Sequence, residues 1–214
     1  AILLRIDGVG FGLPALNDPD EPLFMATAVE MLSGPTLNPG WFGHPGTITF
    51  YSLMLVVALV GGLGVATGRF GDFDAFATAV YADPGIIFLP ARLLMVLFGV
   101  ACVWMTYRLG KRLGGERLGL VASAILAVNA VHIEYSQIIR TDMQGSFFIL
   151  LCAQSALAIA QDGRRRDVLL AGLFAGLACA TKWPAGVIAV TVVGAGLYRW
   201  KSGAANWRQQ ALFG

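Results

Sequence analysis

Long, nearly uncharged apolar runs are the feature that most constrains this chain. They cover residues 47–68, 86–109, 118–136, 145–161, 167–181 and 184–200. A helix crosses a bilayer with about 20 apolar residues, so runs of this length predict membrane-spanning helices. Only 13% of the 214 residues are charged, whereas a soluble domain carries about 25%. We therefore expect an all-α integral membrane protein. The net charge of +2 gives no reason to expect nucleic-acid binding.

Basic residues fill every second link between these runs. They cluster at residues 108–117, 164–166 and 199–208. Positively charged links face the cytoplasm in membrane proteins, so these three links are expected there. The alternate links, around Arg140 and around Lys182, are then expected outside.

The run 47–68 decides the side of an acidic stretch, DPDEP, at residues 18–22. The span 86–109 must begin outside, so the segment 69–85 before it is external. If 47–68 crossed the membrane, DPDEP would be cytoplasmic, and hydropathy alone favours crossing. We favour a helix that does not cross but lies at the interface or among the spans. DPDEP is then external.

Three segments follow from this topology. Residues 1–85 would hold the end of a first span and a first external loop. Residues 86–200 would form five transmembrane helices. Residues 201–214 would be a cytoplasmic link to a missing C-terminal part. The chain begins without Met and is interpreted as a piece of a larger protein, which we expect to be inactive alone.

Charged and polar side chains gather on the external side in this topology. Arg92 lies about 9 Å inside its span, at 1.5 Å per residue. A charge at that depth must snorkel, pair with a carboxylate or line a polar site. Asp142 either caps the helix that begins near Gly145 or belongs to a site. Lys182 either anchors its helix at the interface beside Trp183 or belongs to a site. The full set is Asp18, Asp20, Glu21, His44, Glu134, Arg140, Asp142 and Lys182, with Arg92 beneath.

The order of motifs is similar to that of a known family. DPDEP is followed by FGHPG, then by ARLLMVLFGVACVWMTYRLGKRLGG, HIEYSQIIRTD and LAGLFAGLACATKWP. This order resembles the N-terminal half of polyprenyl-phosphate-dependent membrane glycosyltransferases of the GT-C fold. The groups it resembles are the protein O-mannosyltransferase-like enzymes and the bacterial enzymes that add aminoarabinose or galacturonic acid to lipid A.

The resemblance implies a GT-C-like transmembrane helix bundle with juxtamembrane helices in the first external loop. It implies transfer of a hexose or pentose, with inversion, from a polyprenyl-phosphate carrier to a lipid, polysaccharide or protein acceptor. It also implies a bacterial inner membrane, with the site facing the periplasm or outside.

Residue roles follow from motif position. Asp20 matches the catalytic aspartate, Glu21 its acidic neighbour, and Asp142 the acidic residue of the second external loop. Lys182 matches a lysine that contacts the donor phosphate, and Arg92 matches the arginine that opens the following span. One departure is that Gly43-His44-Pro45-Gly46 stands where lipid A relatives have Glu-Lys-Pro-Pro.

Glycosyl transfer needs a base for the acceptor hydroxyl and a cation for the departing phosphate. Asp20 is the expected base, and Lys182, Arg140 and then Arg92 are expected to bind the phosphate. No cofactor is required by this scheme. A divalent cation, Mg²⁺ or Mn²⁺, held by Asp20 and His44 is a second option. The alternative functions are a secondary transporter, which also has intramembrane charges, and a non-catalytic membrane assembly subunit.

Overall fold

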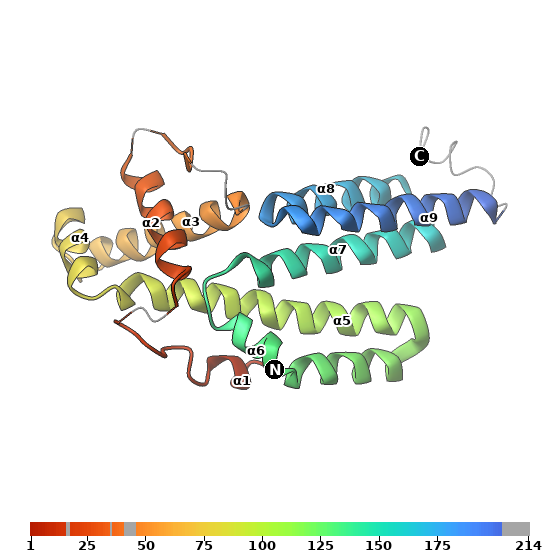
Figure 1. The fold of residues 1–214 in the computed structure, drawn as a ribbon, viewed down its shortest axis with the longest axis horizontal. Coiled ribbons are helices and arrows are strands. Elements are labelled where there is room, and N and C mark those ends of the chain that lie inside the picture. The colour runs from red at the N-terminus through yellow and green to blue at the C-terminus, as the bar shows by residue number, and fades with distance from the viewer. Residues whose placement is uncertain (16–17, 35, 41–45, 203–214) are drawn as a thin grey trace. The chain divides into compact units, whose positions relative to one another are not determined.

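The computed structural model describes residues 1–15, 18–34, 36–40 and 46–202. The described residues form helices and no strand (Figure 1). Three of these helices, α3, α5 and α7, are long and apolar enough to cross a membrane. The predicted fold class, an all-α membrane helix bundle, is confirmed. The elements are α1 (Leu3–Ile6), α2 (Glu21–Ser33), α3 (Thr47–Ala66), α4 (Phe73–Ala82), α5 (Gly85–Val128), α6 (Ala130–Ser136), α7 (Thr141–Gln161), α8 (Arg165–Thr181), the 3-10 helix η1 (Trp183–Ile188) and α9 (Ala189–Lys201).

The chain forms two compact units. The first contains residues 1–100 and 127–143, and the second contains residues 101–126 and the chain from Gln144 onward. The segment 127–143, which includes α6 and the link to α7, therefore packs with the N-terminal residues. This long-range return brings Arg140 into the same unit as the DPDEP stretch.

Apolar side chains from α2, α3, α4 and α5 form the core of the first unit. On α2 the buried positions recur every three or four residues, which places them on one helix face. Phe24 of α2 and Phe50 of α3 meet with their ring centroids 5.5 Å apart. The core consists of Phe24, Met25, Ala28, Met31, Phe50, Leu53, Val57, Phe70, Phe76, Ile87, Phe88, Ala91, Met95 and Ile139.

Two glycines let α4 fold back against α3. A Cβ on Gly61 would lie 2.8 Å from the ring of Phe76, and one on Gly64 would lie 2.4 Å from the ring of Phe70. Both rings are buried. The glycine content of 47–68 therefore has a packing reason, because only glycine leaves room for these aromatic side chains. It gives no information about whether α3 crosses the membrane.

The two arms of α5 form a tight hairpin. Gly114 and Gly115 have non-helical backbone angles, and Gly115 has φ 84° and ψ −179°, a region that essentially only glycine adopts. A Cβ on Gly119 would lie 2.6 Å from the backbone oxygen of Tyr107. Figure 1 shows the chain of α5 turning back on itself at this break. The predicted link between the runs 86–109 and 118–136 is therefore a two-glycine break in an otherwise helical segment.

Within the second unit, one arginine of α5 and one of α9 donate hydrogen bonds to the C-terminal end of α7 and to the residue after it. Arg112 of α5 donates to the side chain of Gln161 at 2.7 Å and to Asp162 at 2.9 Å. Arg199 of α9 donates to the backbone oxygen of Gln161 at 2.9 Å. Carbonyls at a helix C-terminus lack intrahelical partners, so Arg199 satisfies one of them. Pro184 lies in η1, between α8 and α9.

Two predicted helix boundaries differ from the structure. The run 118–136 is divided at Asn129, whose side chain accepts a hydrogen bond from the backbone N–H of His132 at 2.9 Å and caps α6. Helix α7 begins at Thr141, several residues before the expected start near Gly145. Asp142 therefore lies within the first turn of α7 instead of preceding it as a cap. An Asn or Asp within an apolar run does not fix a helix boundary, because its side chain can either cap a new helix or project from the interior of an existing one.

Candidate functional site

The DPDEP stretch forms a turn that starts α2. The side chain of Asp18 accepts hydrogen bonds from the backbone N–H groups of Asp20 at 3.0 Å and Glu21 at 3.3 Å. Asp20 occupies the N-cap position but its side chain makes no cap hydrogen bond. Pro22 lies in the first turn, where its missing N–H costs nothing. The side chain of Asp18 therefore accepts the hydrogen bonds at the start of α2, and the carboxylate of Asp20 is available to other partners.

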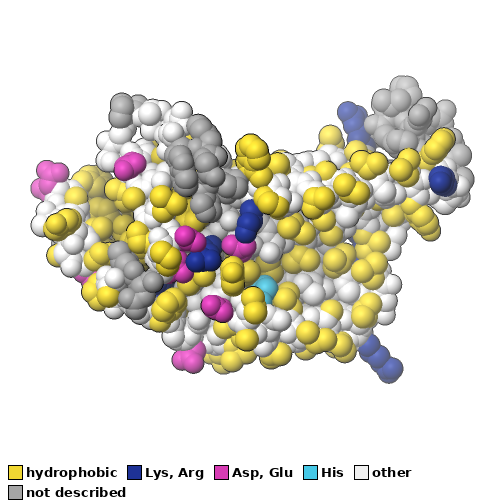
Figure 2. Space-filling view, viewed as in Figure 1, with side chains coloured by type: hydrophobic (Ala, Val, Ile, Leu, Met, Phe, Trp, Pro, Cys, Tyr) yellow, Lys and Arg dark blue, Asp and Glu magenta, His cyan; other side chains and the backbone are white. Residues whose placement is uncertain are grey.

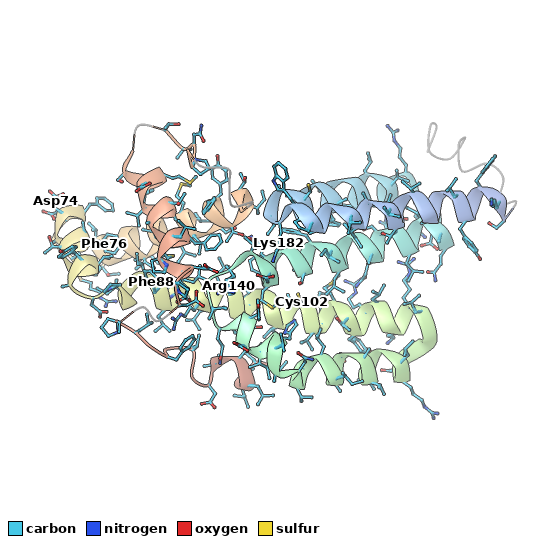
Figure 3. The ribbon with its side chains drawn as sticks, viewed as in Figure 1. Asp74, Phe76, Phe88, Cys102, Arg140 and Lys182 are labelled. Carbon is cyan, nitrogen blue, oxygen red and sulfur yellow. The ribbon has the colours of Figure 1, made fainter. Side chains whose placement is uncertain are left out.

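Arg140 bridges the two aspartates of this turn. Its Nη2 lies 3.2 Å from Asp18 Oδ2 and 3.0 Å from Asp20 Oδ2. The side chain of Asp20 is 43% exposed, while that of Asp18 is 13% exposed. The guanidinium also lies over the ring of Tyr135, 5.7 Å from its centroid. The mutual repulsion of the crowded carboxylates is thus offset by Arg140, which Figure 3 labels, and Asp20 is the more exposed of the two aspartates.

A buried ion pair lies beneath this cluster. Arg92 Nη2 is 2.6 Å from Glu21 Oε2, and Arg92 Nε donates to Glu21 Oε1 at 2.8 Å. Both side chains are fully buried. Glu21 Oε1 also accepts from the backbone N–H of Ile139 at 2.9 Å. Glu21 therefore joins α2 and α5 to the residue that precedes Arg140, and among the alternatives for Arg92 the structure selects pairing with a carboxylate.

Two arginines fix the N-terminal segment through further hydrogen bonds. Arg92 Nη1 donates to the backbone oxygens of Val9 at 2.9 Å and Phe11 at 2.7 Å. Arg5 is fully buried, and its guanidinium contacts Nδ1 of His132 at 2.8 Å. Because arginine only donates, this nitrogen of His132 is the acceptor. His132 is half-buried, and its other ring nitrogen, Nε2, has no hydrogen-bond partner within the described ranges.

The other predicted site residues lie elsewhere. Asp142 is half-buried in the first unit, in the first turn of α7. Lys182 is half-buried in the second unit, where it ends α8 with an extended backbone. Its convergence with Asp20 and Arg140 stays a prediction. His44 lies outside the described residues.

Two cavities of the first unit differ in chemistry. One of about 620 Å³ lies among α2, α3, α4 and the start of α5, and no charged side chain lines it. The other, of about 400 Å³, is lined by Asp18, Glu134 and Arg140 together with Tyr135 and Phe11. Of these two cavities, the second is the one lined by charged side chains. In Figure 2 the acidic side chains on the visible face lie over the first unit, within an otherwise largely hydrophobic surface.

Metal binding was the second option for this cluster. Within the described part of the chain, no group of three or more His, Cys, Asp or Glu side chains is arranged to hold a metal ion. Asp18 and Asp20 instead face the guanidinium of Arg140. The proposed pair of Asp20 and His44 stays a prediction, since His44 is not among the described residues.

The sequence analysis predicted that these residues lie on one face, but it did not predict that they have different surroundings and different roles. It treated Asp20 and Glu21 as catalytic neighbours, although one is exposed and the other is buried against Arg92. It also gave Tyr135 no role. One signal was available for the ion pair: Arg92 is the single charge inside the apolar core of the run 86–109, and a buried arginine needs a carboxylate.

Comparison with known proteins gives one match. A family model described as dolichyl-phosphate-mannose-protein mannosyltransferase matches residues 74–209, which is more than half of the chain. The match includes Arg92, Arg140, Asp142 and Lys182, whereas the DPDEP stretch precedes it. No curated protein and no solved structure matches the chain.

Proposed function

This chain belongs to the dolichyl-phosphate-mannose-protein mannosyltransferase family, and we propose that it transfers a sugar to an acceptor on the external face of the membrane. Membership makes it an integral membrane glycosyltransferase of the GT-C type with a polyprenyl-phosphate sugar donor. The external face, the inverting outcome and the acceptor class, whether lipid, polysaccharide or protein, belong to the proposal. So do the bacterial inner membrane and the likeness to aminoarabinose or galacturonic acid transferases.

The observation that supports the proposal is the difference in solvent exposure between the side chains of Asp20 and Glu21. Asp20 is the exposed carboxylate of the cluster and is held by Arg140. Glu21 is buried on Arg92 and on the backbone of Ile139. A general base must reach the proton that it removes. Asp20 meets this requirement and Glu21 does not, so we assign Glu21 and Arg92 to positioning the cluster.

The reaction balances as a single displacement. Asp20 accepts the proton of the acceptor hydroxyl, and the acceptor oxygen forms a bond with the anomeric carbon of the donor sugar. The bond between that carbon and the phosphate oxygen breaks, and polyprenyl phosphate leaves with the electron pair. One displacement inverts the anomeric configuration. Lys182 is the residue we propose for the leaving phosphate, because a cation there stabilises the developing charge. Asp142 is proposed to assist from the start of α7.

The experiment is Asp20→Asn in the full-length protein. We expect transfer from a polyprenyl-phosphate sugar to fall by at least about 100-fold, the usual contribution of a general base, while donor binding is kept. Asp74→Asn is the matched control, because Asp74 is exposed on α4 in the same unit. Turnover of the Asp20 variant close to that of the control would remove Asp20 from the role. Transfer measured with and without EDTA tests the Mg²⁺ or Mn²⁺ option.

The transporter alternative rests on Arg92 as an intramembrane charge and on helices broken by glycine and proline. Arg92 is enclosed by Glu21 and two backbone carbonyls, so only the broken helices still support it. Crowded carboxylates repel one another, which by itself would argue against a non-catalytic assembly subunit. Arg140 offsets that repulsion, so family membership, and not electrostatics, is what favours an enzyme.

A further inference from the structure

The cavity beside Arg140 is large enough to hold a small molecule. Its volume of about 400 Å³ falls within the range of small-molecule sites, about 300–1,000 Å³. Its wall combines charged side chains, Asp18, Glu134 and Arg140, with two aromatic rings, Tyr135 and Phe11. Aromatic walls with a few convergent polar groups are typical of sites for small organic ligands.

The charges of the cavity disfavour a phosphate. Arg140 is its single cation, and that cation is already shared by Asp18 and Asp20. Glu134 is the second carboxylate of the cavity wall after Asp18, is exposed, and forms no ion pair among the described residues. These two carboxylates, with Asp20 bound to the same arginine, outnumber the one guanidinium, and the excess of negative charge repels a phosphate group. Carboxylates accept hydrogen bonds only, so the cavity suits a ligand that donates them.

Arg140 has one further unused donor. Its Nε is buried and has no hydrogen-bond partner within the described ranges. A buried donor without a partner costs free energy until an acceptor reaches it. A sugar hydroxyl can both accept from Arg140 and donate to Glu134. The rings of Tyr135 and Phe11 offer flat apolar surfaces against which the C–H face of a sugar ring can pack.

We propose that this cavity binds a hydroxyl-bearing sugar ring and that Glu134 is a specificity-determining residue within it. The proposal rests on the proposed function for its place in a reaction. The sugar comes either from the donor or from the acceptor. In both cases Glu134 accepts hydrogen bonds from ring hydroxyls.

The test measures sugar binding without turnover. Saturation-transfer NMR on the full-length protein in detergent would use methyl glycosides of mannose, glucose, galactose and glucosamine as probes. We expect at least one to bind, and Glu134→Ala to weaken it about tenfold or more, the effect of losing a hydrogen bond to a charged group. Glu30→Gln and Glu134→Gln form a matched pair, because Glu30 is exposed on α2 outside the cavity. Only the Glu134 variant should change the preference among the probes.

Three outcomes would overturn the proposal: no probe binds the wild-type protein, Glu134→Ala binds as well as wild type, or inorganic phosphate displaces the sugar. Unfolding temperatures equal to wild type would show that the variants are folded, as expected for an exposed side chain. Competition by polyprenyl-phosphate mannose would assign the cavity to the donor sugar, and its absence would assign the cavity to an acceptor sugar.

The two proposals fail separately. If the protein transfers no sugar from any polyprenyl-phosphate donor, the proposed function fails while sugar binding at Glu134 is still measurable. If transfer occurs but the choice of sugar is the same in Glu134→Gln as in wild type, the role of Glu134 fails and the function stands.

Discussion

Asp20 and Glu21 are adjacent in sequence but have different surroundings. Asp20 lies at the N-cap of α2 and faces Arg140, whereas Glu21 opens the helix and points into the core toward Arg92. Successive residues at a helix start project in different directions, about 100° apart in the helix itself. One short acidic stretch can therefore supply both an exposed carboxylate and a buried anchor.

Glu21→Gln tests the anchor. The variant leaves Arg92 as a buried charge without its carboxylate, and breaking such a pair costs about 3–5 kcal/mol. We expect a lower unfolding temperature and reduced transfer, because the single amide oxygen that remains must accept from both Arg92 and the backbone N–H of Ile139, next to Arg140. Thermal unfolding of the full-length protein in detergent measures the first effect.

A double variant provides the control. Replacing both partners with leucine removes the unpaired charge, so Glu21→Leu with Arg92→Leu should be less destabilised than the sum of the two single variants predicts. Additive losses would mean that the two side chains are not coupled, which would contradict the buried pair.

At the scale of elements, glycines determine which helices pack closely. Gly61 and Gly64 admit the rings of Phe76 and Phe70, and Gly119 admits the backbone of Tyr107. A hydropathy pattern indicates only an apolar helix at these positions. The close approaches were therefore not predictable, since a partner 6, 12 or 15 residues away must be known before the missing Cβ has a meaning.

Gly119→Ala and Gly172→Ala should have opposite effects. The new Cβ at position 119 would lie 2.6 Å from the backbone oxygen of Tyr107, which cannot move aside as a side chain would. Overpacking of this kind costs about 1–3 kcal/mol. Gly172 lies in α8 with nothing within 4 Å of the added atom, so alanine there should stabilise the helix by about 0.5–1 kcal/mol. Thermal unfolding of the two variants compares them, and equal shifts would argue against the tight α5 hairpin.

At the scale of the whole molecule, the open question is the side of the membrane that each segment faces. Helix α3 is long and apolar enough to cross, whereas the arrangement that we favour, in agreement with the family resemblance, is a helix that does not cross. Burial within the fold does not separate these cases, because α3 presents one face to the core in either arrangement. The non-crossing placement and the external site stay predictions.

Cysteine labelling separates the two arrangements. In a background without Cys102, Cys152 and Cys179, single cysteines at Asp20 and Asp74 should both react with an impermeant thiol reagent added outside. A cysteine at Arg165, in a link expected in the cytoplasm, should react only after permeabilisation. If position 20 behaves like position 165, then α3 crosses and the acidic cluster is cytoplasmic.

The sequence by itself determined the class of the protein, an all-α membrane bundle, because apolar run length and charge asymmetry are properties of single segments. It also led to the prediction that Asp20, Arg140 and Asp142 lie on one face of the membrane, which stays a prediction. Only the tertiary structure decided which charges pair, with Glu21 on Arg92 and Asp18 and Asp20 on Arg140. These partners are separated by 71 to 122 residues. Which acid meets which base depends on how the helices pack, and local sequence patterns do not encode that geometry.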